Sequence, residues 1–155
     1  FGAAAHTEND RSLSVFRVER RDDQEIKWEL IAEQTRKAFA GQLAVAARLG
    51  DRSRFDRRTQ ATARPVQSRL TVDNETSEFA TVLEISCLDE TGILYRITRA
   101  FTELDLDIVS ARVQTLGSEV IDAFYIRDQS GNKIEDPEHL AEIELAVLRW
   151  IDMDL

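Results

Sequence analysis

The sequence predicts an α+β fold in which two helices cover one face of an antiparallel sheet. Three observations support this. Apolar side chains alternate with a period of two along residues 79–88, their spacing becomes helical after residue 92, and a strand, strand, helix pattern follows up to residue 152. A chain of 155 residues has room for one such domain with appendages.

The first strand and the first helix of this unit are predicted from the change of period at residue 92. Along residues 79–88 the alternation places Leu83, Ile85 and Cys87 on one face. After residue 92 apolar side chains recur three and four residues apart, and charged side chains are expected on the opposite, solvent-facing side. The apolar positions are Leu94, Ile97, Phe101 and Leu104, and the charged ones are Arg96, Arg99 and Glu103. Cys87, the single cysteine, is expected to be a small core residue.

A hairpin and a second helix complete the unit. Residues 107–115 and 120–127 read as strands, and Gly117 supplies the turn between them. Asp136 and Pro137 form a helix start, with an N-cap followed by proline at the first helical position. The order β-α-β-β-α is most of a ferredoxin-like βαββαβ arrangement, whose last strand is expected to be very short or to lie beyond the last residue.

The N-terminal part resembles the second half of this unit. Residues 12–18 are similar in pattern to residues 120–126, and each segment is followed by polar residues and a helix, in the first copy from about 25 to 47. We therefore interpret residues 1–48 as the C-terminal half of a first module and residues 76–155 as a second, nearly complete module. Because the first module's strand lacks a partner of its own, we expect it to dock on another module, in this chain or in a second copy.

The segment between the modules, residues 49–75, is rich in arginine and has little apolar periodicity, which predicts a linker. These arginines could be solvated, could bind an acidic partner, or could lie against the acidic C-terminal module. Residues 1–69 carry 14 basic and 10 acidic residues, and residues 70–155 carry 6 and 19, so their net charges are about +4 and −13.

Composition excludes several classes of function. A net charge of −9 opposes nucleic-acid binding, and no apolar run approaches the roughly 20 residues that cross a membrane. We therefore expect a cytoplasmic protein with no nucleic-acid or membrane partner. With His6 and His139 as the two histidines, no metal or nucleophile constellation is recognisable, so neither catalysis nor a cofactor is expected. The first residue is Phe rather than Met, so we expect a piece of a longer parent.

The segment 83–101 resembles the start of an ACT domain, in which a strand runs into Asp-Arg-Pro-Gly-Leu-Leu and then a helix. Here the turn is Asp89-Glu90-Thr91-Gly92-Ile93-Leu94, so Glu90 and Thr91 stand where the family has Arg-Pro. Residues 106–117 and 122–126 are similar to the last of the tandem ACT domains in the uridylyltransferase/uridylyl-removing enzymes that act on P-II protein. Tandem ACT domains would also explain the internal repeat.

This resemblance implies a ferredoxin-like ACT fold that binds an amino acid, most plausibly glutamine, and regulates the catalytic domains of a parent enzyme. The implied ligand site is Asp89, Gly92, Ile93 and Leu94. Gly92 would open the helix N-terminus to the ligand or would simply make the turn, and Asp89 would accept the ligand's ammonium group or cap the helix. The alternatives are an assembly module that pairs with another ACT unit and binds nothing, and an RNA-recognition module, which the acidic charge opposes.

Overall fold

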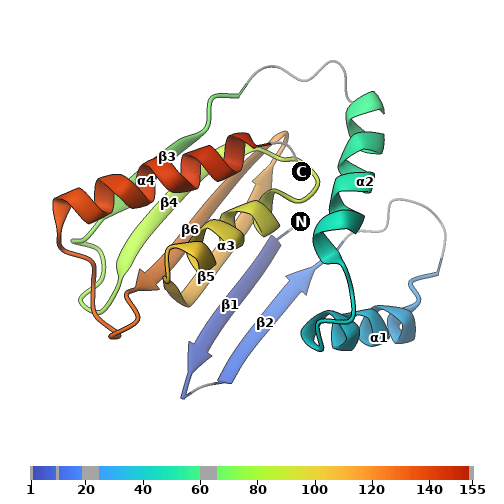
Figure 1. The fold of residues 1–155 in the computed structure, drawn as a ribbon, viewed down its shortest axis with the longest axis horizontal. Coiled ribbons are helices and arrows are strands. Elements are labelled where there is room, and N and C mark those ends of the chain that lie inside the picture. Colours follow the sequence, from blue (N-terminus) through green and yellow to red (C-terminus); the bar gives the residue numbers. More distant parts are fainter. Residues whose placement is uncertain (1, 10, 19–24, 60–65, 154–155) are drawn as a thin grey trace.

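The computed structural model describes residues 2–9, 11–18, 25–59 and 66–153. Six strands form one antiparallel sheet in the order β2-β1-β5-β6-β4-β3, and helices α3 and α4 cover one face of it (Figure 1). The elements are β1 (Gly2–Glu8), β2 (Arg11–Arg17), α1 (Trp28–Phe39), α2 (Val45–Thr59), β3 (Arg69–Asp73), β4 (Thr81–Leu88), α3 (Ile93–Glu103), β5 (Asp107–Leu116), β6 (Glu119–Arg127) and α4 (Pro137–Asp152). The predicted α+β class is confirmed.

The core lies between the sheet and the two helices, as the apolar periods predict. Phe101 of α3 and Phe124 of β6 are almost fully buried and pack edge to face, with ring centroids 5.1 Å apart. The predicted face of β4 is buried in the same cluster, together with Ile97 of α3 and Val147 of α4. Leu94, on the predicted apolar side of α3, and Trp150 of α4 are only partly buried at its margin.

Helix α4 begins as its sequence predicts. Asp136 is the N-cap and its carboxylate accepts a hydrogen bond from the backbone N–H of His139 at 3.2 Å, while Pro137 occupies the first turn. Ile143, Val147 and Ile151 form the buried stripe of the helix. This stripe fixes α4 beside α3 on the sheet (Figure 1).

The region predicted as a linker contains regular structure at both of its ends. Residues 45–59 form α2, and residues 60–65 lie outside the described part. Residues 69–73 form β3, which pairs with the outer edge of β4 and buries Leu70 against the core. A strand that precedes β4, rather than one that follows α4, therefore forms this edge of the sheet. The five-residue strand was missed because its two apolar residues are too few to establish a period.

Helix α1 is shorter than the helix expected over residues 25–47. It ends at Phe39, and a turn in which Gly41 adopts a φ of 68° separates it from α2. Glycine takes this left-handed conformation readily, whereas other residues are strained there. The turn therefore divides the expected helix in two.

The expectation that the first module's strand lacks a partner of its own was wrong. Residues 2–8 form β1, which pairs antiparallel with β2 along its whole length. The segment Gly-Ala-Ala-Ala-His-Thr-Glu is poor in β-branched and aromatic residues, so local propensity did not indicate a strand. The other edge of β1 pairs with β5, so the hairpin docks on the second module within this chain.

The register between β1 and β5 has approximate twofold symmetry. Ala4 pairs with Arg112, and each stands four residues before the last pair of its own hairpin, Glu8↔Arg11 and Leu116↔Glu119. A twofold axis through the Ala4–Arg112 pair makes Gly2 equivalent to Ser110 and His6 equivalent to Gln114. The observed pairs Gly2↔Gln114 and His6↔Ser110 are exchanged by this axis, as the symmetry requires. Arg11 and Glu119 begin the second strand of their hairpins, so counting onward from them makes residues 12–18 equivalent to residues 120–126. This correspondence agrees with the sequence repeat.

The first module keeps apolar surface exposed. Phe16 is equivalent to the buried Phe124, yet it is 62% exposed, and Leu13 and Val15 of β2 are also exposed. Helix α1 has an apolar side but contains no buried residue. In Figure 1, α1 and α2 lie beside the sheet rather than over β1 and β2.

Limited proteolysis tests whether the hairpin is docked. We expect early cleavage at residues 40–44, between the two helices that pack least on the sheet, because exposed segments with few packing contacts open most easily. The fragment that contains β1 and β2 should stay bound to residues 69–152 through the β1–β5 ladder. Native mass spectrometry of the digest provides the measurement. Rapid loss of the hairpin while residues 76–152 survive would show that it is not docked.

Candidate functional site

The turn between β4 and α3 is built around Gly92. This residue is the N-cap of α3, with φ 89° and ψ 4°, and as a glycine it has no side chain with which to cap the helix. The backbone N–H of Ile93, the first in α3, donates to the carbonyl of Glu90 at 3.1 Å. The backbone N–H of Asp89 donates to the carbonyl of Ser118 at 2.9 Å, which holds the turn against the β5–β6 hairpin. Gly92 occupies the N-cap position and Asp89 precedes it in the turn, so both roles considered for the Asp89 carboxylate stay predictions.

Arg96 was expected on the solvent side of α3, but the structure buries it. Its side chain is 6% exposed and one guanidinium nitrogen lies 2.9 Å from a carboxylate oxygen of Glu90. A second nitrogen donates to the carbonyl of Met153 at the end of α4. A buried charge requires such partners. The helical pattern of α3 alone could not show that the end of α4 covers this position.

The Glu90–Arg96 ion pair also accounts for a departure from the ACT pattern. Glu90 stands where the family has arginine, so the turn carries a negative charge in place of a positive one. In this chain that charge faces an arginine supplied by the helix itself. The pair fixes the turn to the first part of α3.

Asp122 is a buried carboxylate of β6, paired with Ile85 of β4 and Val113 of β5, and was not among the predicted site residues. It lies on the helix side of β6 between Val120 and Phe124 and is 1% exposed. One carboxylate oxygen accepts from the backbone N–H of Gln114 at 3.3 Å, and the other has no hydrogen-bond partner among the described residues. Burial raises the pKa of Asp122 to about 7, and the charge of Asp89 adds to the effect. An aspartate within an alternating apolar strand was the available signal.

Cys87 is a core residue, as expected. It is 1% exposed, and burial raises the pKa of its thiol to about 12. The thiolate that nucleophilic chemistry requires is therefore suppressed at neutral pH. Across the ranges described, no group of three metal-ligating side chains comes together. Within those same ranges, no helix is long and apolar enough to span a membrane.

A cavity of about 250 Å³ lies between α3 and the docked hairpin. Leu94 and Thr98 of α3 form one wall, and the floor consists mainly of small residues from β1, β2 and β5. The floor includes Ala3, Ala5, Ser12, Ser14 and Ala111. The cavity is somewhat smaller than the roughly 300–1,000 Å³ of pockets for drug-sized ligands, so its size suits a small metabolite.

The cavity adjoins the buried carboxylate. Ala3 pairs with Val113, and Val113 pairs with Asp122, so these three residues form one row across the sheet. Ala3 and Val113 line the cavity. Neighbouring residues of such a row lie on the same face of the sheet. Asp122 is therefore the next residue in the row beyond Val113, on the face that carries the cavity.

The structure brings together part of the predicted site. Leu94 lines the cavity, and Gly92 stands two residues earlier, at the start of the same helix. Ile93 is 6% exposed and belongs to the core, so its side chain faces away from any ligand at the surface. Asp89 precedes Gly92 in the turn. The contributions of Ala3 and Ala5 were missed because β1 was not recognised.

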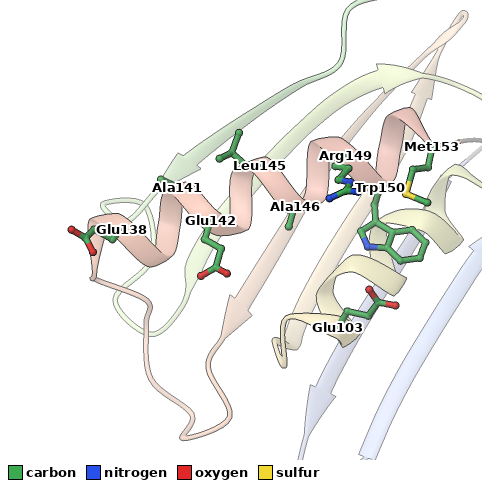
Figure 2. Close-up of a pocket in the computed structure, with 9 residues that line it drawn as sticks. All are labelled: Glu103, Glu138, Ala141, Glu142, Leu145, Ala146, Arg149, Trp150 and Met153. Atoms are coloured by element: carbon green, nitrogen blue, oxygen red, sulfur yellow. The ribbon is translucent and has the colours of Figure 1, made fainter.

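A second, larger groove lies on the outer side of the helices (Figure 2). Glu103 of α3 and residues along α4 line it, among them Glu138, Glu142 and Trp150. None of the predicted site residues belongs to this groove.

Comparison with known families identifies the fold. Residues 69–151 match a family model described as an ACR9-like, ACT-like domain. The chain belongs to the ACT-like family. The match begins at the first residue of β3, so the ACT-like unit includes a strand that lies inside the predicted linker.

Several bacterial relatives carry the name bifunctional uridylyltransferase/uridylyl-removing enzyme. The enzyme from Bradyrhizobium sp. (strain BTAi1) is 32% identical over 152 residues, which cover 96% of this ACT-like chain and 16% of the relative. That from Rhodospirillum rubrum is 36% identical over 141 residues, covering 88% and 15%. That from Azospirillum brasilense is 41% identical over 83 residues, covering 54% and 9%. The chain thus matches only a small part of each relative, and no solved structure matches it significantly.

Proposed function

We propose that this ACT-like region senses an amino acid, with glutamine as the ligand, and regulates the catalytic domains of a parent uridylyltransferase/uridylyl-removing enzyme that acts on P-II protein. The region itself does not catalyse. The observation that carries the proposal is the left-handed Gly92 at the start of α3, beside the cavity that Leu94 lines. The similarity to the named relatives supports the choice of parent.

The chemistry of an α-amino acid is complementary to this turn. Its carboxylate suits the backbone N–H groups at a helix N-terminus, where the helix dipole favours negative charge. Its ammonium group suits the carboxylate of Asp89 in the same turn. The absence of a side chain at Gly92 leaves the backbone approachable.

The location of the turn suggests how binding would be transmitted. The cavity has α3 of the second module on one side and the β1–β2 hairpin of the first module on the other. A ligand held there would favour the arrangement in which the two modules are closed on each other. Such a ligand shifts a conformational equilibrium by its difference in affinity for the two arrangements.

Gly92→Val tests the position of the site. Valine in the left-handed region is strained by about 1–3 kcal/mol and covers the helix N-terminus, so we expect amino-acid binding to be abolished while the fold survives. Calorimetric titration with glutamine gives the affinity. Gly131→Val is the matched control, because Gly131 has a φ of 82° in a loop remote from α3 and open space around it. Normal glutamine affinity in a folded Gly92→Val variant would refute this placement.

The same substitution in the full-length parent separates regulation from catalysis. Basal activity should be unchanged, since the variant alters only the coupling between sites, and the response to glutamine should be lost.

The competing function is an assembly module that binds no ligand. The exposed Leu13, Val15 and Phe16 of β2 favour it, because exposed apolar residues on an edge strand invite pairing with another chain. Titration with a panel of amino acids and measurement of the oligomer mass on one preparation distinguish the two functions. A concentration-dependent dimer without any saturable heat of binding would favour assembly.

A further inference from the structure

The face of the sheet that α3 and α4 leave uncovered contains a trough above β1, with a volume of about 410 Å³. Side chains alternate between faces along a strand, so the exposed Arg112 lies opposite the buried Ala111 and Val113, which face the helices. The trough is therefore separated by the sheet from the cavity at Leu94. Its open-face residues are Gly2, Ala4, Val15, Arg17, Arg112 and Gln114.

The strand register explains why this surface is hollow. Gly2 pairs with Arg17 on one side and with Gln114 on the other, and Ala4 pairs with Val15 and with Arg112. In both rows a residue with little or no side chain stands between larger neighbours. The backbone of β1 is thus the floor, and the side chains of β2 and β5 are the walls.

Two arginines stand on the two walls of this floor, Arg17 in the row of Gly2 and Arg112 in the row of Ala4. Arg17 comes from β2 and Arg112 from β5, and both are exposed. Neither makes an ion pair or a hydrogen bond with any residue that the structure describes. By contrast, Arg96 and Arg99 of the same acidic module each pair with a glutamate. Two guanidinium groups with no carboxylate partner among the described residues therefore lie beside one small-residue floor, in a chain whose net charge is −9.

We propose that this trough binds the phosphate group of a small phosphorylated molecule. Two guanidinium groups on opposite walls match the charge of a phosphate dianion, and its tetrahedral oxygens can accept hydrogen bonds from both walls at once. A carboxylate carries a single negative charge, so it matches two guanidinium groups less well than a phosphate dianion. Gln114 adds an uncharged donor, and Val15 offers an apolar contact to the rest of the molecule.

Calorimetric titration with inorganic phosphate and with glycerol 3-phosphate at low ionic strength tests the proposal. Both compounds should bind saturably. Glycerol 3-phosphate should bind more tightly than phosphate if the trough also holds the organic part, and the two affinities should be equal if it holds the phosphate group alone. Arg17→Gln and Arg112→Gln should each weaken binding by about tenfold, the loss typical of one charge-assisted contact. Arg69→Gln is the matched control, because it removes the same charge from an exposed position at the far edge of the same sheet face. It should change affinity by less than about twofold.

A second variant tests the shape of the site without changing its charge. Ala4→Val places a strand-favouring side chain in the middle of the floor, so it should abolish phosphate binding while the fold persists. No saturable binding by the unmutated chain, or equal losses from Arg69→Gln and Arg112→Gln, would overturn the proposal. Neither result would affect the proposed amino-acid site on the other face of the sheet.

Discussion

Replacing Phe101 with alanine is expected to lower the free energy of unfolding by about 3–5 kcal/mol, because it leaves a cavity in a closely packed core. Phe101 is 1% exposed and packs edge to face on Phe124 beneath α3. Urea unfolding followed by circular dichroism gives the measurement.

Phe79→Ala provides the control for this experiment. Phe79 belongs to the same module but is 69% exposed, so its loss should cost no more than about 0.5 kcal/mol. A change below about 1 kcal/mol for Phe101→Ala would place that residue on the surface and contradict the assignment of α3.

The second large effect is a dependence of stability on pH that Asp122 produces. Burial holds its pKa at about 7 in the folded chain, while an exposed aspartate has a pKa of about 3.9. The folded state therefore binds more protons than the unfolded state between about pH 4 and pH 7. Stability should fall as pH rises through that window and remain lower above it. The full loss is on the order of 4 kcal/mol.

Asp122→Asn should remove this loss, since the amide has a similar shape and no charge. The variant should be more stable than the unmutated chain at pH 8, and the difference should shrink toward pH 4. Urea unfolding at both pH values measures it, with Asp107→Asn as the control at an exposed aspartate of β5. A gain that is the same at both pH values would show that Asp122 is not a buried carboxylate with a raised pKa.

The elements of the second module were predictable because each has a clear local period. The apolar face of β4, the stripe of α3 and the N-cap at Asp136 are each encoded within a short segment of the sequence. β1 was not predictable, because its alanines have no strand preference and the strand is held by pairing with β2 and β5. Its place in the sheet depends on residues more than 100 positions away.

The candidate site was predictable only in part for the same reason. Gly92 was identified from the turn pattern, and the structure gives it the left-handed φ that favours glycine. The burial of Arg96 depends on the end of α4, which covers its side chain. The surroundings of Asp122, a residue of β6, depend on the neighbouring strand β5. The cavity at Leu94 exists only because the first hairpin docks beside α3. These features arise from contacts between distant segments, which a local pattern does not contain.

Amide NMR spectra recorded while glutamine is added test the central claim most directly, because they report both binding and its position. The account predicts saturable shifts of the Gly92, Ile93 and Leu94 amides at the start of α3, and of Ala3 and Ala5 across the cavity. Amides of α1, which lies apart from this site, should not move. Two results would contradict this claim: spectra of the folded chain that stay unchanged at high glutamine concentration, or shifts confined to residues away from this turn.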